Sequence, residues 1–227
     1  QYYKAMPDAF KLGNMTKTEK DGAFLYEMVR ALPVTLVKNA LVWGIFPDEK
    51  QGGWLVAIYG ENAPRKIHAK TLVLATGAYD TPVAFPGWTL PGVITAGAAL
   101  VMTKTQRIAP GKRALVAGTG PLLLSAAAHL IDAGVKIDAV CEVSRPIFKA
   151  IPHVFTALGQ LGRISEGITY MSKMVAAGTP YKMGWTILEA RGGDRVEEAV
   201  IARVDQTCRE IPGTRKTLPV DTVIVGF

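Results

Sequence analysis

The residues best suited to chemistry form a short turn with two glycines: Gly118, Thr119, Gly120, Pro121 and Leu122. The turn follows an apolar run and opens a Leu- and Ala-rich segment. The first glycine permits a tight turn, and the second lets the backbone approach a pyrophosphate. The N-terminus of the following helix would add unpaired N–H groups and the positive end of its dipole. The pattern predicts a nucleotide or dinucleotide site at residues 118–122.

Glu142 ends the next predicted strand, where an acidic side chain typically accepts hydrogen bonds from ribose hydroxyls. It would favour an adenosine with a free 2′-hydroxyl over one with a 2′-phosphate. Arg145 nearby leaves NADP as an alternative ligand. Leu123 stands where the full pattern has a third glycine, and we expect it to push helix and strand slightly apart. The alternative is a doubly wound domain that keeps the turn and binds nothing.

Other catalytic patterns are missing from the sequence. It contains neither GxxxxGK[ST] nor the G-x-S-x-G of a nucleophilic serine. The two cysteines, Cys141 and Cys208, form no CxxC redox pair, and His68, His129 and His153 lack the spacing of metal ligands. We therefore expect no metal site and assign no residue a catalytic role.

The charge balance is basic, with 26 Lys and Arg against 19 Asp and Glu, a net charge of +7. The basic residues are spread thinly, so the nucleic-acid pattern of a basic face with interleaved aromatics is missing. Between Asp80 and Asp132 there is no acidic residue, while Lys104, Arg107 and the pair at 112–113 lie inside this stretch. Such a local field suits a small anionic ligand. A mostly buried stretch with a few solvated basic residues explains the pattern equally well.

Two uncharged runs, residues 81–103 and 114–131, are long enough to suggest membrane spans. Prolines and glycines interrupt both runs where turns are expected, so we predict no transmembrane segment. The first residues show no basic-then-apolar leader pattern, so we expect no signal peptide, and two cysteines are too few for a disulfide scaffold. These features favour a reducing, cytoplasmic location.

Hydrophobic periodicity and turn residues predict an α/β chain. Helices are expected over residues 16–32, 94–106, 121–133 and 152–177. Strands are expected over residues 34–46, 54–59, 66–75, 113–117, 135–142, 183–190, 196–204 and 220–225. The third of these strands continues as a buried-strand pattern that closes on Gly77. Residues 80–91, rich in proline and aromatics, are expected to be a linker or a rigid crossing between two units.

A weak internal repeat also emerges. Two strands flank residues 52–53 and a buried-strand pattern then ends at Gly77, while two strands flank residues 192–193 and a similar pattern ends at Gly226. A strand–GxG–helix–strand unit precedes the second copy and not the first. We expect the missing unit upstream of Gln1, which makes this chain a piece of a longer protein.

The segments 72–100 and 111–134 carry a resemblance to a known family, most specifically in ATGAYDTPVAFPGWTLPGV at residues 75–93. The chain resembles the FAD-dependent pyridine nucleotide-disulfide oxidoreductase superfamily. It is similar in particular to the amine-oxidising subunits of the hydrogen cyanide synthase, opine oxidase, sarcosine oxidase and proline dehydrogenase types. The resemblance covers essentially the whole chain.

This resemblance implies two dinucleotide-binding domains. Residues 1–90 would be part of an FAD-type domain without its N-terminal βαβ unit, and residues 91–227 a Rossmann-like three-layer nucleotide-binding domain with a β-meander. Three residues, Ala75, Thr76 and Gly77, would approach FAD. The turn at 118–122 with Glu142 would form a second site for NAD or for ATP or ADP, and Gly226 completes the expected cofactor-binding residues. Without the first GxGxxG, the chain alone is expected to bind FAD poorly and to be inactive.

The function that the resemblance implies is that of a flavin-dependent oxidoreductase subunit. It would oxidise an amine or amino acid of the opine, sarcosine, proline or glycine type, with other subunits of a hetero-oligomeric enzyme as partners. The alternative is a non-catalytic nucleotide-binding or subunit-docking module whose glycine turn holds a structural ADP-like ligand. Analogy of fold does not choose between them.

Overall fold

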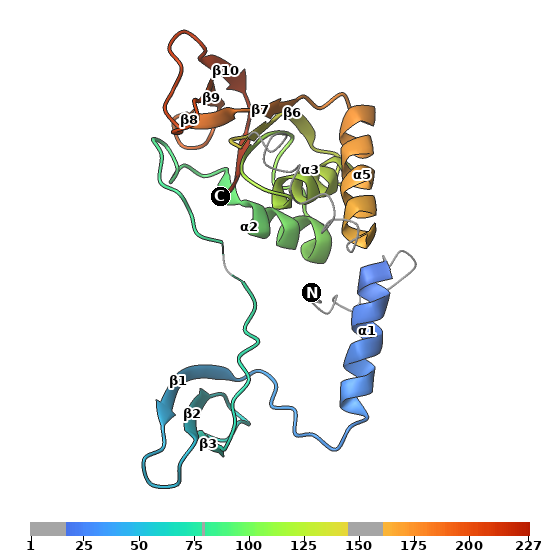
Figure 1. Cartoon of the computed structure of the whole chain (residues 1–227), viewed down its shortest axis with the longest axis vertical. Coiled ribbons are helices and arrows are strands. Elements are labelled where there is room, and N and C mark those ends of the chain that lie inside the picture. Colours follow the sequence, from blue (N-terminus) through green and yellow to red (C-terminus); the bar gives the residue numbers. More distant parts are fainter. Residues whose placement is uncertain (1–16, 79, 145–160) are drawn as a thin grey trace. The chain divides into compact units, whose positions relative to one another are not determined.

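The computed structural model describes residues 17–78, 80–144 and 161–227, and the chain divides into two compact units, Gln1–Ala78 and Tyr79–Phe227 (Figure 1). We call them the first and the second unit and describe each by itself. The division falls earlier than the boundary expected at residue 90. Which cofactor each part would hold stays a prediction.

The first unit contains one helix and one antiparallel sheet in the order β1-β2-β3. Its elements are α1 (Lys17–Arg30), β1 (Leu41–Pro47), β2 (Trp54–Tyr59) and β3 (Lys66–Ala69). The β1–β2 turn is closed by Asp48, whose Oδ1 accepts hydrogen bonds from the backbone N–H of Lys50 and Gln51, both at 3.1 Å. Two glycines with positive φ, at 71° and 84°, complete the turn. The strand expected over residues 34–46 is shorter in the structure, where β1 begins at Leu41.

The prediction of a buried strand that ends at Gly77 is wrong. The strand β3 ends at Ala69, and residues 72–78 have no regular structure. Val73 is 84% exposed and Leu74 is 67% exposed. Among the described residues, none donates or accepts a backbone hydrogen bond with residues 71–78. An apolar run forms a strand only where a neighbouring strand offers its own N–H and C=O groups.

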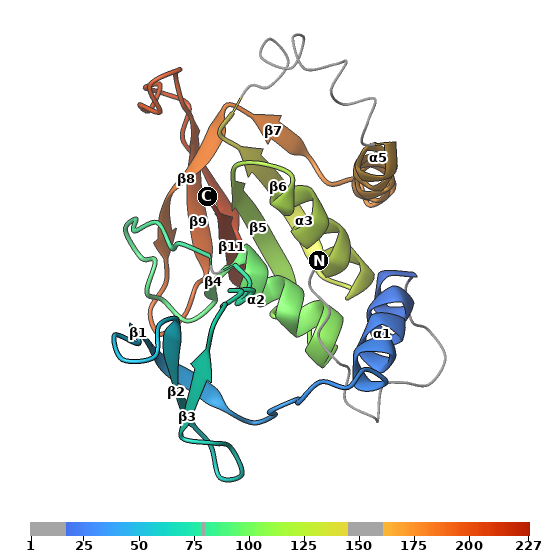
Figure 2. The ribbon, with the colours of Figure 1, turned by 60° about the horizontal axis from the view of Figure 1, so that its bottom comes forward.

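The second unit has three layers around a five-stranded parallel sheet in the order β4-β11-β5-β6-β7 (Figure 2). Its strands are β4 (Val93–Thr95), β5 (Arg113–Gly118), β6 (Lys136–Glu142), β7 (Tyr181–Met183) and β11 (Thr222–Gly226). One face is covered by the helices α2 (Ala96–Leu100), its continuation η2 (Val101–Gln106), α3 (Leu122–Asp132) and α5 (Leu161–Ala176). The other face is covered by an antiparallel meander of β8 (Trp185–Arg191), β9 (Glu198–Arg203) and β10 (Lys216–Pro219).

Alternation along β5 shows how the sheet builds two cores. Ala114 and Val116 pack toward the helices, whereas Leu115 and Ala117 pack toward the meander, and all four are fully buried. A strand covered on both faces needs a continuous apolar run rather than an alternating one. The structure thus confirms the expected α/β, three-layer fold with a meander.

Several element boundaries differ from the sequence-based expectations. The helix expected from residue 94 begins at Ala96, because β4 pairs with β11 and Thr95 then caps the helix by accepting a hydrogen bond from Ala98 N–H. The helix continues as a π-helix to Gln106. The short strands β7 and β10 were not expected. Of the helix expected over 152–177, residues 161–176 are helical, and 152–160 lie outside the described residues.

Residues 80–91 are not a free linker. Phe85 and Leu90 pack against the core on the meander side of the sheet. The Pro86 carbonyl accepts a hydrogen bond of 2.9 Å from Ala190 N–H, and a Cβ at Gly87 would lie 1.9 Å from the Ala190 oxygen. These contacts make the segment part of the second unit and explain why the division precedes it.

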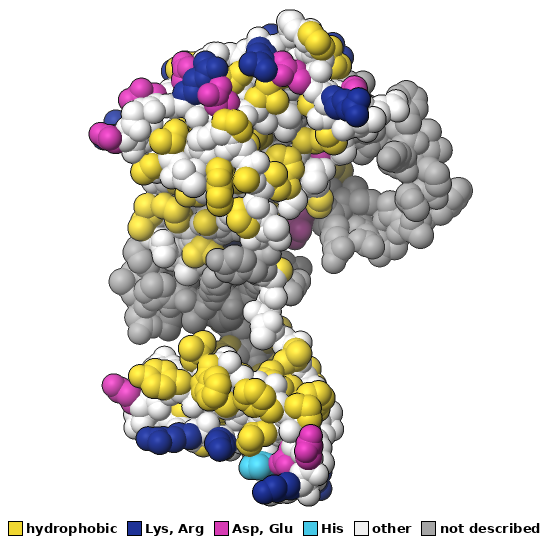
Figure 3. Space-filling model, turned by 90° about the vertical axis from the view of Figure 1, so that its left-hand side faces the viewer, with side chains coloured by type: hydrophobic (Ala, Val, Ile, Leu, Met, Phe, Trp, Pro, Cys, Tyr) yellow, Lys and Arg dark blue, Asp and Glu magenta, His cyan; other side chains and the backbone are white. Residues whose placement is uncertain are grey.

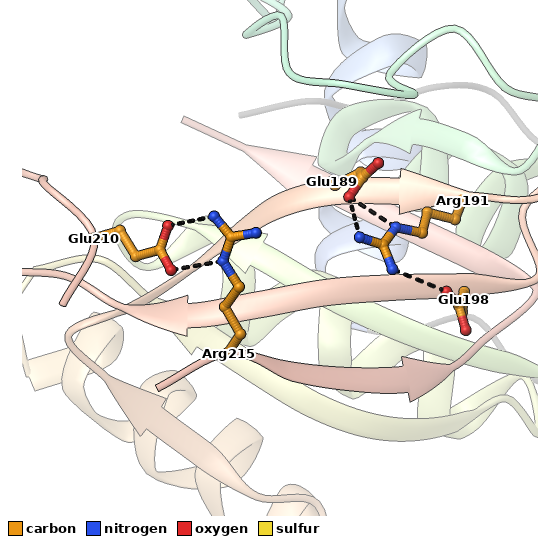
Figure 4. Close-up of polar contacts among 5 residues, drawn as sticks. All are labelled: Glu189, Arg191, Glu198, Glu210 and Arg215. Carbon is orange, nitrogen blue, oxygen red and sulfur yellow. Dashed lines mark hydrogen bonds and ion pairs between the residues drawn. The ribbon is translucent and has the colours of Figure 1, made fainter. Parts of the chain in front are cut away.

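The meander carries charged pairs on its surface (Figure 4). Arg191 contacts Glu189 on its own strand and Glu198, which is its Cα partner on β9. Arg215 and Glu210 form a second pair with two hydrogen bonds of 2.7 and 2.8 Å. Exposed pairs of this kind contribute little to stability, so we assign them no role in the site.

Candidate nucleotide site

The residues expected at the second cofactor site meet at the carboxyl edge of the parallel sheet. Gly118 ends β5 and is the Cα partner of Gly226 on β11 and of Glu142 on β6. This edge is where ligands of open α/β sheets bind. We call residues 118–122 the glycine turn. The structure therefore brings six expected residues and Gly226 together.

Gly118 is required by the close approach of two strands. A Cβ there would lie 1.9 Å from the Gly226 oxygen. The same oxygen accepts a hydrogen bond of 2.7 Å from Thr119 N–H, and Val143 N–H donates to the Gly118 oxygen at 2.9 Å. The expected tight turn is confirmed, and its cause is the approach of β11.

Gly120 is required by backbone conformation and not by space. Its φ is +88°, in the left-handed region, and no atom lies within 4 Å of an added Cβ. Its N–H donates to Glu142 Oε2 at 3.0 Å. This carboxylate therefore holds the middle of the turn against the end of β6.

Glu142 is buried, with 2% of its surface exposed, and its carboxylate accepts five hydrogen bonds. Oε1 accepts from Thr119 Oγ1 at 2.9 Å, and from Ser144 N–H and Oγ at 3.2 and 2.6 Å. Oε2 accepts from Gly120 N–H and from the Tyr181 hydroxyl at 3.4 Å. A carboxylate offers about four lone pairs. The expected acceptor of ribose hydroxyls is thus already saturated by the chain itself.

Tyr181 reaches this carboxylate from β7, a strand that sequence reasoning missed. Burial raises the pKa of Tyr181 to about 12, and the nearby charge of Glu142 acts in the same direction. The hydroxyl therefore stays protonated and remains a donor to Glu142 at neutral pH. Ser144 follows Glu142 by two residues, and this spacing could have suggested its contact.

Leu123, in the place of the third glycine of the pattern, packs against Gly226 of β11. Its side chain is fully buried in the core on the helix side. A Cβ added at Gly226 would lie 3.2 Å from Leu123 Cδ2 and 3.1 Å from Ala96 Cβ. A glycine on the neighbouring strand thus supplies the space that the third glycine of the pattern would otherwise provide.

The basic pair at residues 112–113 does not lie at the glycine turn. Lys112 and Arg113 lie at the amino end of β5, and a strand of six residues separates its ends by roughly 17 Å. The Arg113 guanidinium pairs with Asp138 at 2.9 Å, which raises the pKa of Arg113. The second explanation, solvated basic residues around a buried stretch, is therefore the better one for this pair.

The residues expected to approach FAD belong to the first unit, whereas the glycine turn belongs to the second. Ala75, Thr76 and Gly77 are exposed, and Gly77 has a φ of +86°. The described residues around them form no hydrogen-bonded cradle. Their approach to FAD stays a prediction.

The described ranges contain no group of three or more His, Cys, Asp and Glu that could hold a metal ion. Burial raises the pKa of Cys141 to about 12, so this thiol is a core residue and not a nucleophile. Trp88 lines a small apolar hollow with Phe85, Val93 and Val225. No helix in the described part of the chain is long and apolar enough to cross a membrane.

Comparison with known proteins places the chain among flavoprotein oxidoreductases in fold and sequence. Hydrogen cyanide synthase subunit HcnB of Pseudomonas protegens is 28% identical over 173 residues, which cover 76% of this chain and 37% of that protein. An opine oxidase subunit of Rhizobium meliloti is 41% identical over 131 residues, 56% of this chain and 25% of that one. In sequence and fold the chain resembles the FAD-dependent pyridine nucleotide-disulfide oxidoreductase superfamily. No protein-family model matches it.

The superfamily fold is also found in a solved structure. Thioredoxin reductase of T. acidophilum superposes with a TM-score of 0.59 at 17% identity, covering 92% of this chain and 58% of that one. At this identity the match shows the fold alone. The chain spans between a quarter and 37% of the length of these two curated relatives.

Proposed function

We propose that this chain is part of a flavin-dependent oxidoreductase subunit that oxidises an amine or amino acid. The observation that carries the proposal is the sequence similarity to two proteins named as subunits, one of a hydrogen cyanide synthase and one of an opine oxidase. The substrate class that follows is an opine, sarcosine, proline or glycine. Bound FAD would accept the hydride, and the protein would supply position and polarity.

Exposed apolar side chains of the first unit support an assembly with further polypeptide. Figure 3 shows hydrophobic side chains gathered on the part that holds the β1–β3 sheet. Leu41, Trp43 and Tyr59 are each more than 60% exposed. Apolar surface of this extent is typical of protein interfaces. Other subunits are therefore the partners that we propose.

Gly77 is the residue of this chain that we propose to lie nearest to the flavin. Its positive φ lets the backbone turn without a side chain, so that a bound cofactor could approach the main chain closely. The described residues include no candidate for a catalytic acid, base or nucleophile at this position, and we assign none.

A second candidate function is a non-catalytic nucleotide-binding or subunit-docking module. The observation that favours it is the saturated Glu142 carboxylate, which ties the glycine turn to its own sheet. In this case the second unit would be a docking scaffold within the assembly.

The test uses the longest natural polypeptide that contains this sequence, purified with the subunits that accompany it and supplied with FAD. We expect a flavin absorbance spectrum that bleaches without oxygen on addition of glycine, proline, sarcosine or an opine. Gly77→Ala should lower the bound flavin, while Gly52→Ala, with a similar φ of +71° and open space around it, should not. Absence of flavin, or a flavin that no such substrate bleaches, would overturn the proposal. The second candidate function, a non-catalytic module, would then remain.

A further inference from the structure

The first backbone donors of the glycine turn are already used within the chain. Thr119 N–H donates to the Gly226 oxygen at 2.7 Å, and Gly120 N–H donates to Glu142 at 3.0 Å. Pro121 has no N–H at all. Three consecutive positions of the turn therefore offer no free N–H to a ligand.

The acceptor on Gly120 is itself an anion. Glu142 is 2% exposed, so its charge is screened little by solvent. A phosphate oxygen that accepted the Gly120 N–H would lie directly beside this buried like charge. The basic pair at 112–113 lies at the other end of β5 and does not compensate it. Charge and hydrogen bonding thus both oppose a phosphate at this position.

The N-terminus of α2 lies at the same edge of the sheet, and a backbone N–H there is also bonded to a carboxylate of the chain. After β4, Gly97 N–H donates to Asp80 Oδ2 at 2.6 Å. A Cβ at Gly97 would lie 2.5 Å from the same oxygen, so the carboxylate sits tightly against the backbone. At the starts of both α2 and α3, a carboxylate from the chain itself accepts a hydrogen bond from a glycine N–H.

We propose that Glu142 is the resident anion of the glycine turn and keeps the diphosphate of a free dinucleotide out of it. The carboxylate takes the place of a ligand phosphate on Gly120 N–H. It joins the carboxyl ends of β5 and β6 and contacts Tyr181, the first residue of β7. In this role Glu142 is a positioning residue of the turn and not an acceptor for ribose. The inference concerns the second unit alone and does not depend on the proposed flavin chemistry.

The experiment measures binding of inorganic pyrophosphate and ADP to the 227-residue chain by isothermal titration and by thermal unfolding. Glu142→Gln keeps the size of the side chain and removes its charge, while the Thr119 and Ser144 hydroxyls can turn to accept from the amide. Asp138→Asn is the matched control, because Asp138 lies on the same strand and pairs with Arg113 away from the turn. We expect no saturable binding by wild type or by the control, and at least about tenfold tighter binding by Glu142→Gln.

Two results would overturn the proposal. One is saturable binding of either ligand by wild type that Glu142→Gln weakens, since the carboxylate would then support the ligand. The other is equal failure of all three proteins to bind, since the charge would then not be what excludes the ligand. If Glu142→Gln does not fold, the wild type still decides through the amide resonance of Gly120. This resonance should stay in place at millimolar pyrophosphate, and a saturable shift would contradict the proposal.

Discussion

Two apolar segments that each end on a glycine differ in burial: one is exposed and the other lies in the core. Val73 and Leu74, which lead to Gly77 in the first unit, are 84% and 67% exposed. Val223 and Ile224, which lead to Gly226 in the second unit, are fully buried. The two sequences have the same pattern, and the difference arises from their neighbours.

The neighbours of β11 account for its burial. The strand lies between β4 and β5, its Val223 faces the meander, and its Ile224 faces the helices. The segment that ends at Gly77 has no strand beside it among the described residues. An apolar run that ends on a glycine can therefore form a strand, but it does so only where partner strands lie beside it.

Truncation of matched side chains should separate the two segments most strongly. Ile224→Ala leaves a cavity between α3 and the sheet and should lower the free energy of unfolding by about 4 kcal/mol. Leu74→Ala removes an exposed side chain and should cost less than about 0.5 kcal/mol. Urea denaturation followed by circular dichroism measures both. Equal losses would show that residues 72–77 are packed after all.

Substitution of the glycines tests close approach against backbone freedom. Gly118→Ala places a Cβ 1.9 Å from the Gly226 oxygen, so strands β5 and β11 must part, and we expect a loss of about 3 kcal/mol. Gly77→Ala carries the cost of its positive φ, about 1 kcal/mol. The unfolding midpoints of the two variants give the comparison. A smaller loss for Gly118→Ala than for Gly77→Ala would refute the steric account.

The contact between Gly226 and Leu123 should appear as an interaction energy between the two positions in a double-mutant cycle. Gly226→Ala crowds Leu123 and Ala96 and should lower stability by about 1 to 2 kcal/mol, whereas Gly193→Ala, with open space around it, should have no effect. Because Leu123→Ala removes the crowded side chain, the double variant should lose less than the sum of the two single variants. Additive losses would show that the two residues do not share this space.

A pH titration compares the carboxylates that close a turn in each unit. Burial would raise the pKa of Asp221, but hydrogen bonds from Thr222 and from the N–H groups of Lys112 and Arg113 lower it below its usual 3.8. Hydrogen bonds from Gln51 and His68 lower the pKa of Asp48. A lowered pKa contributes stability that is present above the unfolded value and is lost as the pH falls through the folded value.

The stability of both units should therefore decrease below about pH 4. Asp221→Asn should cost about 1 kcal/mol at neutral pH and flatten this decrease for the second unit. Asp48→Asn should act on the first unit alone. Urea midpoints measured at several pH values test this, and an unchanged pH profile for Asp221→Asn would contradict the assignment.

Local features could be predicted from the sequence because their causes are local. Pro121 before the first turn of α3 and Gly134 after its end mark the helix, and the structure has α3 at Leu122–Asp132. The layered α/β fold followed from such elements in order. The glycine turn was placed correctly for the same reason.

The environment of Glu142 could not be predicted, because it depends on residues that are distant in sequence. Tyr181 reaches the carboxylate from β7, a strand of only three residues at the edge of the sheet that leaves no periodic signal. Likewise, the compensation between Leu123 and Gly226 needs β11 beside β5, which no local pattern specifies. The exposure of Leu74 has the same origin, a neighbour that local sequence cannot reveal.

Amide hydrogen exchange of the two glycine-ended segments tests the central claim most directly, because it reports whether each backbone N–H has a partner. The account predicts strong protection at Val223, Ile224 and Val225, whose strand is paired on both sides. It predicts exchange close to the unprotected rate at Val73 and Leu74 in the same sample. Protection at Val73 and Leu74 comparable to that of β11 would contradict the claim that partner strands alone separate the two segments.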